Sequence, residues 1–445
     1  MKTIFLCVTV LLGSSVLQDW AVSGRAAAAG LAADGGSAVL DEWGNRFVTF
    51  GAAVFENPLR TQIRTTIAQL AMFDAVNAVL GGAYCPFASR PASPPGASPE
   101  AAAIRAAYFV AVNEFPSIRP AIDSAYLSSI AAVTGLPDAI ADGAAVGEAA
   151  ATEVLRAREH DGRNDPDLTG YTPGSGPGVW IVTPGSTAPL VPFLRFVRPF
   201  GYDDPARFRP KPPPALDSRI YTADYNEIKD VGRITASSRT AEQSITAIFW
   251  LPSATVLWTA NVRSLASSLD LLTAARFEAI GIAAVTNALL ASWDAKYAYM
   301  FWRPVTAIRA GDTDDNSETA ADPLWAPFLV TPGHPEYPAA HTTVGAGTLG
   351  FYAVWFDTTE LALDVRGAGG LIRHYTNFSE IAAEEGNARV WGGMHWRHST
   401  EVGTDIGSRV GRYTATHLLK PLDDFAPGAS GSWRPFAAFR SPLTR

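Results

Sequence analysis

The feature that most constrains this fold is an apolar pattern of helical period that fills most of the chain. Between Leu59 and Leu80 the apolar residues recur at a spacing close to 3.6. Similar patterns follow over residues 101–158 and 221–309, and further helices are expected from Ala339 and from about Thr400. No repeat of fixed period is present in the sequence. The pattern predicts a mainly α protein made of helical bundles, in two units that resemble four-helix bundles.

One long stretch interrupts the helical pattern. Residues 161–220 are dense in Gly, Pro and Asp, which is typical of an irregular connection over the surface. We expect at most short strands there, near Val179–Val182. The chain is therefore divided into an N-terminal helical region at 40–160, this connection, and a C-terminal catalytic helical region at 221–422.

The first 30 residues are typical of a secretory signal peptide. Lys2 supplies a positive start, Ile4–Leu17 is largely apolar, and small residues follow where a peptidase could cut. The alternative is a frayed, Ala-rich arm. Because Cys7 lies in this segment, Cys85 would be the only cysteine of the mature chain, which excludes an internal disulfide framework and a cysteine-based metal site. We expect a periplasmic or secreted protein.

Composition argues against two classes of partner. The 445 residues carry a formal net charge of −8 with only 18% charged residues, so the chain lacks the basic footprint of a nucleic-acid-binding protein. The strongest candidate for a membrane span, Ile280–Trp293, contains polar residues and ends directly before Asp294. It is shorter than the roughly 20 apolar residues that a span requires, so a buried helix is expected.

Three segments of the C-terminal region carry the candidate chemistry. Lys296 and Arg303 are seven residues apart, and on one helix they would project from the same face. Two partly buried cations repel each other unless an anion lies between them. A solvated basic stripe is the alternative, although the aromatic residues between them argue against full exposure.

The other two segments are weaker when each is taken alone. Pro338 suits a helix start, which would place His341 in a first turn whose free N–H groups can bind an anion. A capping or core histidine is the simpler interpretation of His341 by itself. Arg389 and His395 flank the pair Gly392-Gly393, which indicates a tight loop.

Taken in order, the three segments resemble the signature of the vanadium haloperoxidases and the related type 2 phosphatidic acid phosphatases. The family pattern is K-x6-R-P, then P-S-G-H, then S-R-x5-H-x3-D. The matching residues are Lys296, Arg303, Pro304, Pro338, His341, Arg389 and His395. Three positions depart from the pattern, because Ala339 and Ala388 replace serines and Ser399 replaces the aspartate. The resemblance covers most of residues 40–420 and is strong over 290–405, and it implies a haloperoxidase-like helical fold.

The resemblance also implies an oxyanion site for vanadate, which phosphate could occupy as well. Its residues would be Lys296, Arg303, Ala339, Ala340, His341, Arg389 and His395. His395 would be the vanadium ligand, His341 the general acid–base, and Lys296 the group that polarises bound peroxide. A serine hydroxyl is lost at Ala339, which is expected to weaken anion affinity by about tenfold or more.

The implied activity is a vanadium-dependent haloperoxidase that oxidises halide with hydrogen peroxide to hypohalous acid. A small organic acceptor and a homodimer are further expectations. His334, with Trp302, is a candidate halide pocket, since chloroperoxidases resemble one another in carrying Phe there and algal bromoperoxidases carry His. Bromide or iodide is therefore favoured, with a plain loop histidine as the alternative. Two other functions stay open, namely an acid phosphatase that acts through a phosphohistidine and an inactive oxyanion-binding protein.

Overall fold

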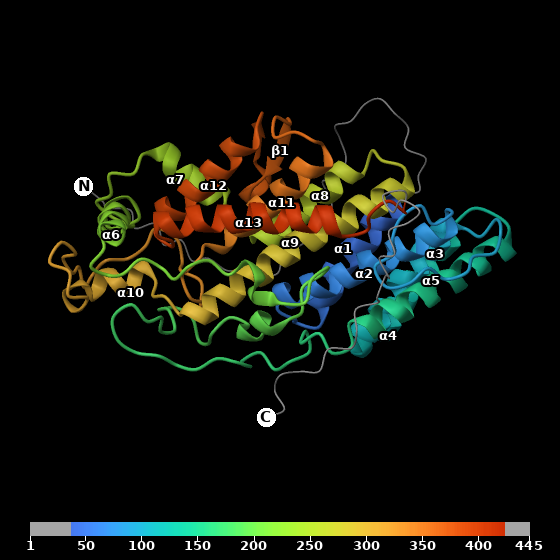
Figure 1. Ribbon diagram of the computed structural model, residues 1–445, viewed down its shortest axis with the longest axis horizontal. Coiled ribbons are helices and arrows are strands. Elements are labelled where there is room, and N and C mark those ends of the chain that lie inside the picture. Colours follow the sequence, from blue (N-terminus) through green and yellow to red (C-terminus); the bar gives the residue numbers. More distant parts are fainter. Residues whose placement is uncertain (1–36, 423–445) are drawn as a thin grey trace, which may run out of the picture.

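The computed structural model describes residues 37–422, in which five helices form an N-terminal bundle (Figure 1). They are α1 (Ala38–Ala53), α2 (Pro58–Val79), α3 (Pro99–Glu114), α4 (Arg119–Ala131) and α5 (Pro137–Ala157). Ser98 followed by Pro99 is a helix start signal, and the Ser98 side chain caps α3 by accepting the N–H of Ala101. The glycines of α5 let it lie directly on α3, since a Cβ at Gly147 would stand 2.2 Å from the carbonyl oxygen of Ala102. The predicted signal peptide lies outside the described residues.

The connection after α5 is irregular, apart from two short 3-10 helices, η2 (Pro192–Phe196) and η3 (Pro205–Phe208). The expectation of short strands at Val179–Val182 is wrong for the described chain, where Val179 forms only an isolated bridge to Phe301. The Trp180 N–H donates to the carbonyl of Met300 at 2.6 Å, and Trp302 N–H donates to Gly178. The connection thus bonds to the segment that follows α9, which contains Arg303. Within the described chain it forms no β-ladder of its own.

The C-terminal bundle contains the remaining helices. They are α6 (Arg219–Val231), α7 (Ala241–Phe249), α8 (Ala254–Ala266), α9 (Leu271–Tyr299), α10 (Pro304–Arg309), α11 (Ala340–Trp355), α12 (Phe378–Trp391) and α13 (Arg397–His417). Short 3-10 turns lie at Gly311–Thr313 (η4) and Ala368–Gly370 (η5). An antiparallel hairpin of β1 (Leu363–Arg366) and β2 (Ile372–Tyr375), which the sequence analysis did not anticipate, pairs Leu363 with Tyr375. The mainly helical fold class is confirmed.

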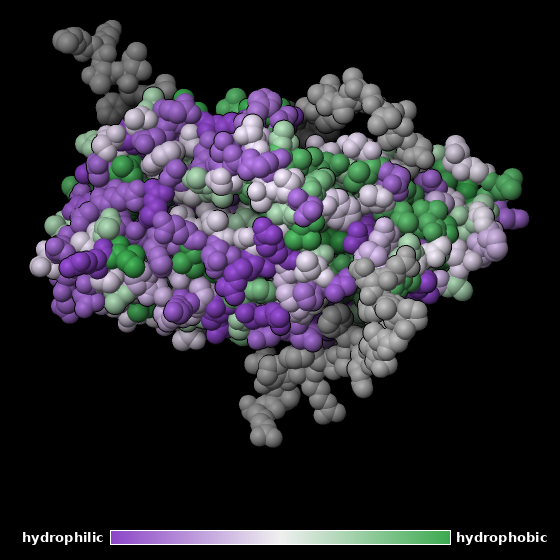
Figure 2. All heavy atoms as spheres, turned by 45° about the horizontal axis from the view of Figure 1, so that its top comes forward, coloured by the Kyte–Doolittle hydropathy of each residue, from purple (hydrophilic) through white to green (hydrophobic). Residues whose placement is uncertain are grey.

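Helix α9 is the centre of the molecule. It packs against α8, α11 and α13, and it meets α2 of the other bundle (Figure 1). It is long and apolar enough to cross a membrane, as is the bent pair α7 and α8, but 94% of the apolar window of α9 is buried inside the protein. Burial on all sides accounts for its near-continuous apolar sequence, and that is the composition of a core helix. Figure 2 shows exposed apolar residues toward the α3–α5 end of the molecule and a more hydrophilic surface over the C-terminal bundle.

Helices α11 and α13 lie unusually close, which fixes the position of the segments at their starts. Gly403, Gly407 and Gly411 recur every four residues along α13, so they form one stripe on the helix. A Cβ at Gly411 would stand 1.8 Å from the carbonyl oxygen of Gly347, and one at Gly407 would stand 2.1 Å from that of Thr343. Only glycine permits this approach, and it brings the histidines before α13 and at the start of α11 into one region.

Candidate active site

Lys296 lies in the last turns of α9 and is completely buried. Its Nζ donates to the carbonyl oxygens of Pro335 at 3.0 Å, Glu336 at 2.8 Å and Pro338 at 2.5 Å. Burial and the neighbouring Arg303 hold the pKa of Lys296 well below its usual value, although Glu336 opposes them. The ammonium thus fixes the loop before α11 through three carbonyl oxygens, and none of the ion pairs within residues 37–422 includes it.

Arg303 reaches the same region by a route that the sequence analysis did not foresee. The two residues do not share one helix face, because α9 ends at Tyr299 and Met300 adopts a left-handed conformation with φ of 51°. Arg303 is instead the N-cap residue of α10 and is fully buried. Burial lowers its pKa to about 10. The structure brings both cations to the loop before α11, and the chain reversal after α9 does so, not the spacing of seven.

The guanidinium of Arg303 connects two histidines. Its Nη1 lies 3.0 Å from Nε2 of His395 and donates to the carbonyl of Met394 at 2.8 Å. Its Nη2 lies 3.0 Å from Nδ1 of His334, and its Nε donates to the backbone carbonyl of that residue. Since a guanidinium can only donate, Nε2 of His395 is the unprotonated nitrogen that accepts.

His395 is held from its other side by a carboxylate. It lies in the turn before α13, is 3% exposed, and its Nδ1 donates to Oε1 of Glu336 at 2.8 Å. The same oxygen accepts the Trp396 N–H at 3.1 Å. Burial lowers the pKa of His395 well below its usual value, and burial raises that of the Glu336 carboxyl to about 7. The imidazole is therefore neutral, with Nδ1 protonated and the lone pair of Nε2 directed at the guanidinium of Arg303.

Arg389 provides the third buried cation, from the last turn of α12. Its Nη2 donates to the carbonyl of Trp250 at 2.8 Å, whereas its buried Nε has no hydrogen-bond partner within residues 37–422. Burial lowers its pKa to about 10, and Glu385, one turn earlier on α12, opposes that shift. Burial raises the pKa of Glu385 to about 8.

His341 occupies the first turn of α11, as predicted, and is partly buried. Its Nε2 donates to the carbonyl of Pro252 at 3.0 Å, so the loop between α7 and α8 bonds to both His341 and Arg389. Burial and Arg389 lower the pKa of His341 well below its usual value. Ala339 is the N-cap residue, and no side chain of the described part of the chain caps this turn. The N–H groups at Ala340 and His341 are thus free to bind an anion.

The candidate halide pocket is only partly assembled. His334 is 5% exposed and contacts Arg303. The aromatic ring that packs on it is Trp293, with centroids 4.9 Å apart. Trp302 stacks instead on Tyr221, with centroids 6.5 Å apart. The structure therefore groups His334 with the site cations and places Trp302 in a neighbouring aromatic cluster.

The donor set of this region suits a tetrahedral oxyanion. Lys296, Arg303 and Arg389 are three buried cations, and none of the ion pairs found within residues 37–422 includes them. The two buried carboxyls beside them have raised pKa values, so they neutralise the cations incompletely near neutral pH. The unpartnered Nε of Arg389, the uncapped start of α11 and the unprotonated Nε2 of His395 would hold vanadate or phosphate.

Two residues of this region escaped the sequence analysis, namely Glu336 and Glu385. Both are essentially inaccessible to solvent, and each lies beside a predicted site residue. Glu385 precedes Arg389 by four residues, which is the spacing of an intrahelical pair and could have drawn attention to it. Glu336 lies in a Pro-rich loop without any periodicity, and only its proximity to the predicted histidine motif could have marked it.

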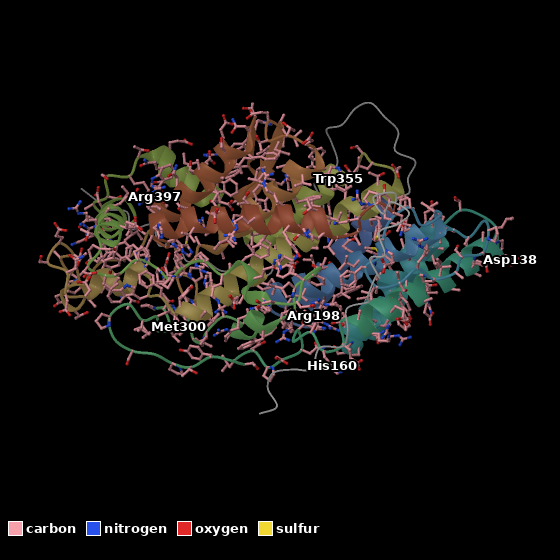
Figure 3. All side chains as sticks on the ribbon, viewed as in Figure 1. Asp138, His160, Arg198, Met300, Trp355 and Arg397 are labelled. Atoms are coloured by element: carbon pink, nitrogen blue, oxygen red, sulfur yellow. The ribbon has the colours of Figure 1, made fainter. Side chains whose placement is uncertain are left out.

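Figure 3 labels Met300 and Arg397, which flank this region at the end of the molecule opposite Asp138.

Comparison with known proteins finds a match in the part of the chain that contains this site. Residues 276–424 match the family model described as the VCPO second helical-bundle domain. A crystal structure of a bacterial vanadium-dependent iodoperoxidase aligns with a TM-score of 0.74 and 24% identity, covering 86% of this chain and 97% of that one. The chain has the fold of the vanadium haloperoxidases. The resemblance predicted from its motifs is confirmed.

Two further relatives define how far the likeness extends. The holo form of a bacterial vanadium-dependent chloroperoxidase aligns with a TM-score of 0.64 and 19% identity over 80% of this chain and 90% of that one. The vanadium chloroperoxidase of Curvularia inaequalis is 26% identical over 180 residues, which is 30% of this chain and 29% of that protein. This last match spans less than a third of either chain, so it concerns one part of each protein and not the whole.

Proposed function

We propose that this chain is a vanadium-dependent haloperoxidase that oxidises bromide or iodide with hydrogen peroxide to hypohalous acid. The observation that carries the proposal is a group of three buried cations without ion pairs whose charges all act on His395, with Arg303 at 3.0 Å from its unprotonated Nε2. An assembly of this kind is costly unless an oxyanion occupies it. When bound, vanadate would supply a Lewis acid that activates peroxide.

The residues of the chain would divide the work around that group. Lys296, Arg303 and Arg389 would neutralise the oxyanion, helped by the N–H groups at the start of α11. His395 would be the protein ligand of vanadium, through Nε2. His341 is neutral and its Nε2 donates to Pro252, so its Nδ1 would be the nitrogen that accepts a proton and returns it.

Halide preference is the finer part of the proposal. His334 is buried against Trp293 and lies at 3.0 Å from Arg303, so its imidazole is part of the cationic region where a halide would approach. This supports bromide or iodide over chloride. Hydrogen peroxide, the halide and a small organic acceptor are the proposed partners, with a homodimer as one assembly. Export to the periplasm or medium is proposed on the signal-like first 30 residues.

An acid phosphatase is the second candidate, and the His395–Glu336 contact favours it specifically. A carboxylate on Nδ1 would stabilise the positive charge that develops on the imidazole when Nε2 attacks a phosphomonoester. The third candidate, an inactive oxyanion-binding protein, draws support from Ala339, which removes a hydroxyl from the site.

The deciding experiment uses the purified apoprotein with hydrogen peroxide, bromide and a phenolic dye, with and without added vanadate. We expect bromination that depends on vanadate and falls by at least about 100-fold in His395→Ala. His374→Ala is the matched control, because His374 lies exposed on β2 and pairs with Asp364. Turnover of nitrophenyl phosphate without vanadate-dependent bromination would favour the phosphatase, and equal rates with chloride and bromide would contradict the halide preference.

A further inference from the structure

Glu336 is joined to the segment of His395 by more than one contact. Its Oε1 accepts both the Nδ1 proton of His395 and the backbone N–H of Trp396. Its own carbonyl accepts Nζ of Lys296 at 2.8 Å. Three residues further on, Ala339 N–H donates to the carbonyl of Ser399 at 3.1 Å. The loop before α11 and the start of α13 are thereby fastened together around one carboxylate.

Ser399 stands where the haloperoxidase pattern has an aspartate. It lies in the first turn of α13, one helical turn after His395, and is 1% exposed. Its hydroxyl lies close enough to Glu336 to lower the pKa of that carboxyl. Neither Oγ of Ser399 nor Oε2 of Glu336 has a hydrogen-bond partner within residues 37–422. Position 399 therefore faces the space that Glu336 fills, and a carboxylate built there would enter the same space.

We propose that Glu336 is the positioning residue of His395 and replaces, from the loop before α11, the carboxylate that the pattern places at position 399. The hydrogen bond to Nδ1 keeps that nitrogen protonated and directs the lone pair of Nε2 toward the oxyanion. The inference rests on the oxyanion site of the proposed function and concerns how this chain builds it. Two carboxylates cannot share the pocket without mutual repulsion, so the presence of Glu336 explains the serine at position 399.

The test is a double-mutant cycle of Glu336→Ala and Ser399→Asp, with Glu336→Gln as a variant of unchanged volume. The readout is the ratio of the Kd values for orthovanadate and inorganic phosphate, measured by calorimetry. Vanadate can take the imidazole as a fifth ligand, whereas phosphate reports only the charge of the site. Long-range nitrogen NMR of the His395 ring reports which nitrogen carries the proton.

We expect Glu336→Ala to weaken the preference for vanadate over phosphate by about 10- to 100-fold and to mix the two tautomers of His395. Adding Ser399→Asp should restore at least about tenfold of that preference and the Nδ1–H tautomer. Ser399→Asp in the wild-type background should weaken vanadate binding, because the two carboxyls then compete. Glu336→Gln should keep the tautomer, since its oxygen can still accept, and should lose part of the preference.

Glu385→Ala, with and without Ser399→Asp, is the matched control, because Glu385 is a buried carboxyl beside Arg389 and not beside His395. Ser399→Asp should give no rescue in that background. A folded double variant that binds vanadate no better than Glu336→Ala would overturn the inference, as would equal effects of Ser399→Asp in all backgrounds. If the cycle behaves as expected while no variant oxidises halide, the proposed activity fails and the role of Glu336 stands.

Discussion

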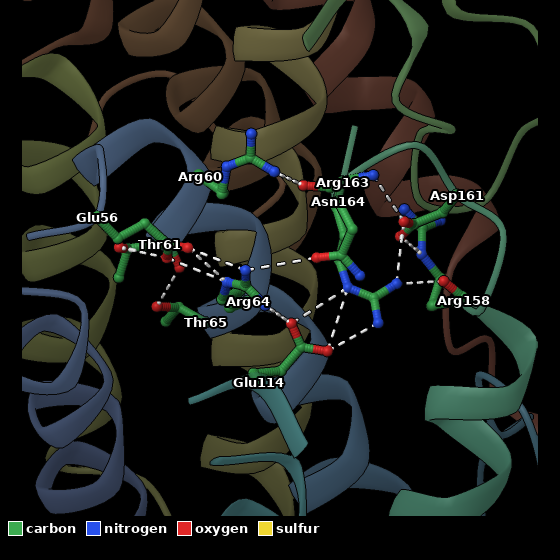
Figure 4. A network of polar contacts seen from close by, with 10 residues as sticks. All are labelled: Glu56, Arg60, Thr61, Arg64, Thr65, Glu114, Arg158, Asp161, Arg163 and Asn164. Atoms are coloured by element: carbon green, nitrogen blue, oxygen red, sulfur yellow. Dashed lines mark hydrogen bonds and ion pairs between the residues drawn. The ribbon is translucent and has the colours of Figure 1, made fainter. Parts of the chain in front are cut away.

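The molecule contains two clusters of buried cations, one in each bundle, and they are built in opposite ways. In the N-terminal cluster the guanidinium groups of Arg64, Arg158 and Arg163 face carboxylates, whereas Arg60 contacts a backbone carbonyl (Figure 4). Arg158 pairs with Asp161 at 2.7 Å, and Arg163 pairs with both Asp161 and Glu114. In the C-terminal cluster, Lys296, Arg303 and Arg389 contact carbonyls and imidazoles, and no ion pair within the described residues includes them.

The difference separates a structural cluster from a binding site. Burial disfavours the charge of Arg163, but Asp161 and Glu114 outweigh it and raise the pKa of that guanidinium. The pKa of Arg158 still falls to about 10 in spite of its pair with Asp161, so the ion pairs distinguish the two clusters more clearly than the pKa values do. Burial lowers the pKa of Arg389 to about 10, because Glu385 offsets only part of the desolvation. A cation whose charge is balanced inside the protein can fasten segments together, here α3 to the turn after α5. A buried cation that no carboxylate of the protein neutralises can bind an anionic ligand.

The largest effect is expected from a substitution that breaks the paired cluster. Arg163→Ala leaves Glu114 and Asp161 buried without their shared partner, so we expect a loss of about 3–5 kcal/mol in the free energy of unfolding, measured with urea. Affinity for vanadate should stay unchanged. Arg156→Ala is the control, since its pair with Glu153 lies at the surface and its loss should not change stability measurably. A change of vanadate affinity in Arg163→Ala would show that the paired cluster also contributes to anion binding, which contradicts its assignment as a purely structural cluster.

The opposite result is expected for the unpaired cluster. Arg389→Met keeps the length of the side chain but removes a charged donor, which should weaken binding of inorganic phosphate by about 10- to 100-fold in calorimetry. Stability without an anion should stay the same or rise, because an unbalanced buried cation is removed and Glu385 can take up a proton. A stability loss as large as that of Arg163→Ala would show that Arg389 is structural.

Much of this arrangement could be predicted from local sequence signals. Apolar periodicity gave the extent of α2, and the cap Ser98 gave the start of α3, because both signals act within a few residues. The ordered motifs assigned Lys296, Arg303 and His395 to one site, and in the structure Arg303 lies 3.0 Å from His395 and the charge of Lys296 acts on that histidine.

The rest depends on tertiary structure, which no short pattern contains. Arg303 arrives at the site through the left-handed residue Met300 and the bridge of the connection to Phe301, so the argument from a shared helix face was wrong. Glu336 lies in a loop whose position is set by Lys296 and by the close approach of α11 and α13. The sequence shows that Ser399 departs from the pattern, but it cannot show that another carboxyl fills the place.

The smallest expected effect concerns the hydroxyl that the site lacks. Ala339 is the N-cap residue of α11, and its backbone lies between the Lys296 loop and the first-turn N–H groups. In Ala339→Ser we expect affinity for phosphate and vanadate to rise by up to about tenfold, since a hydrogen bond to a charged group contributes about 1.5 kcal/mol or more. Isothermal titration of the apoprotein measures it.

The same serine could instead bond to an N–H of its own helix, and the two cases are distinguishable. A cap would raise the free energy of unfolding by about 1 kcal/mol without an anion and leave the affinity unchanged, which would contradict the prediction. Ala388→Ser is the control, because a hydroxyl within α12 can bond to the carbonyl one turn back and should not reach the anion. A gain in Ala339→Ser alone would show that the unpaired cluster still lacks one donor for the ligand it is built to hold.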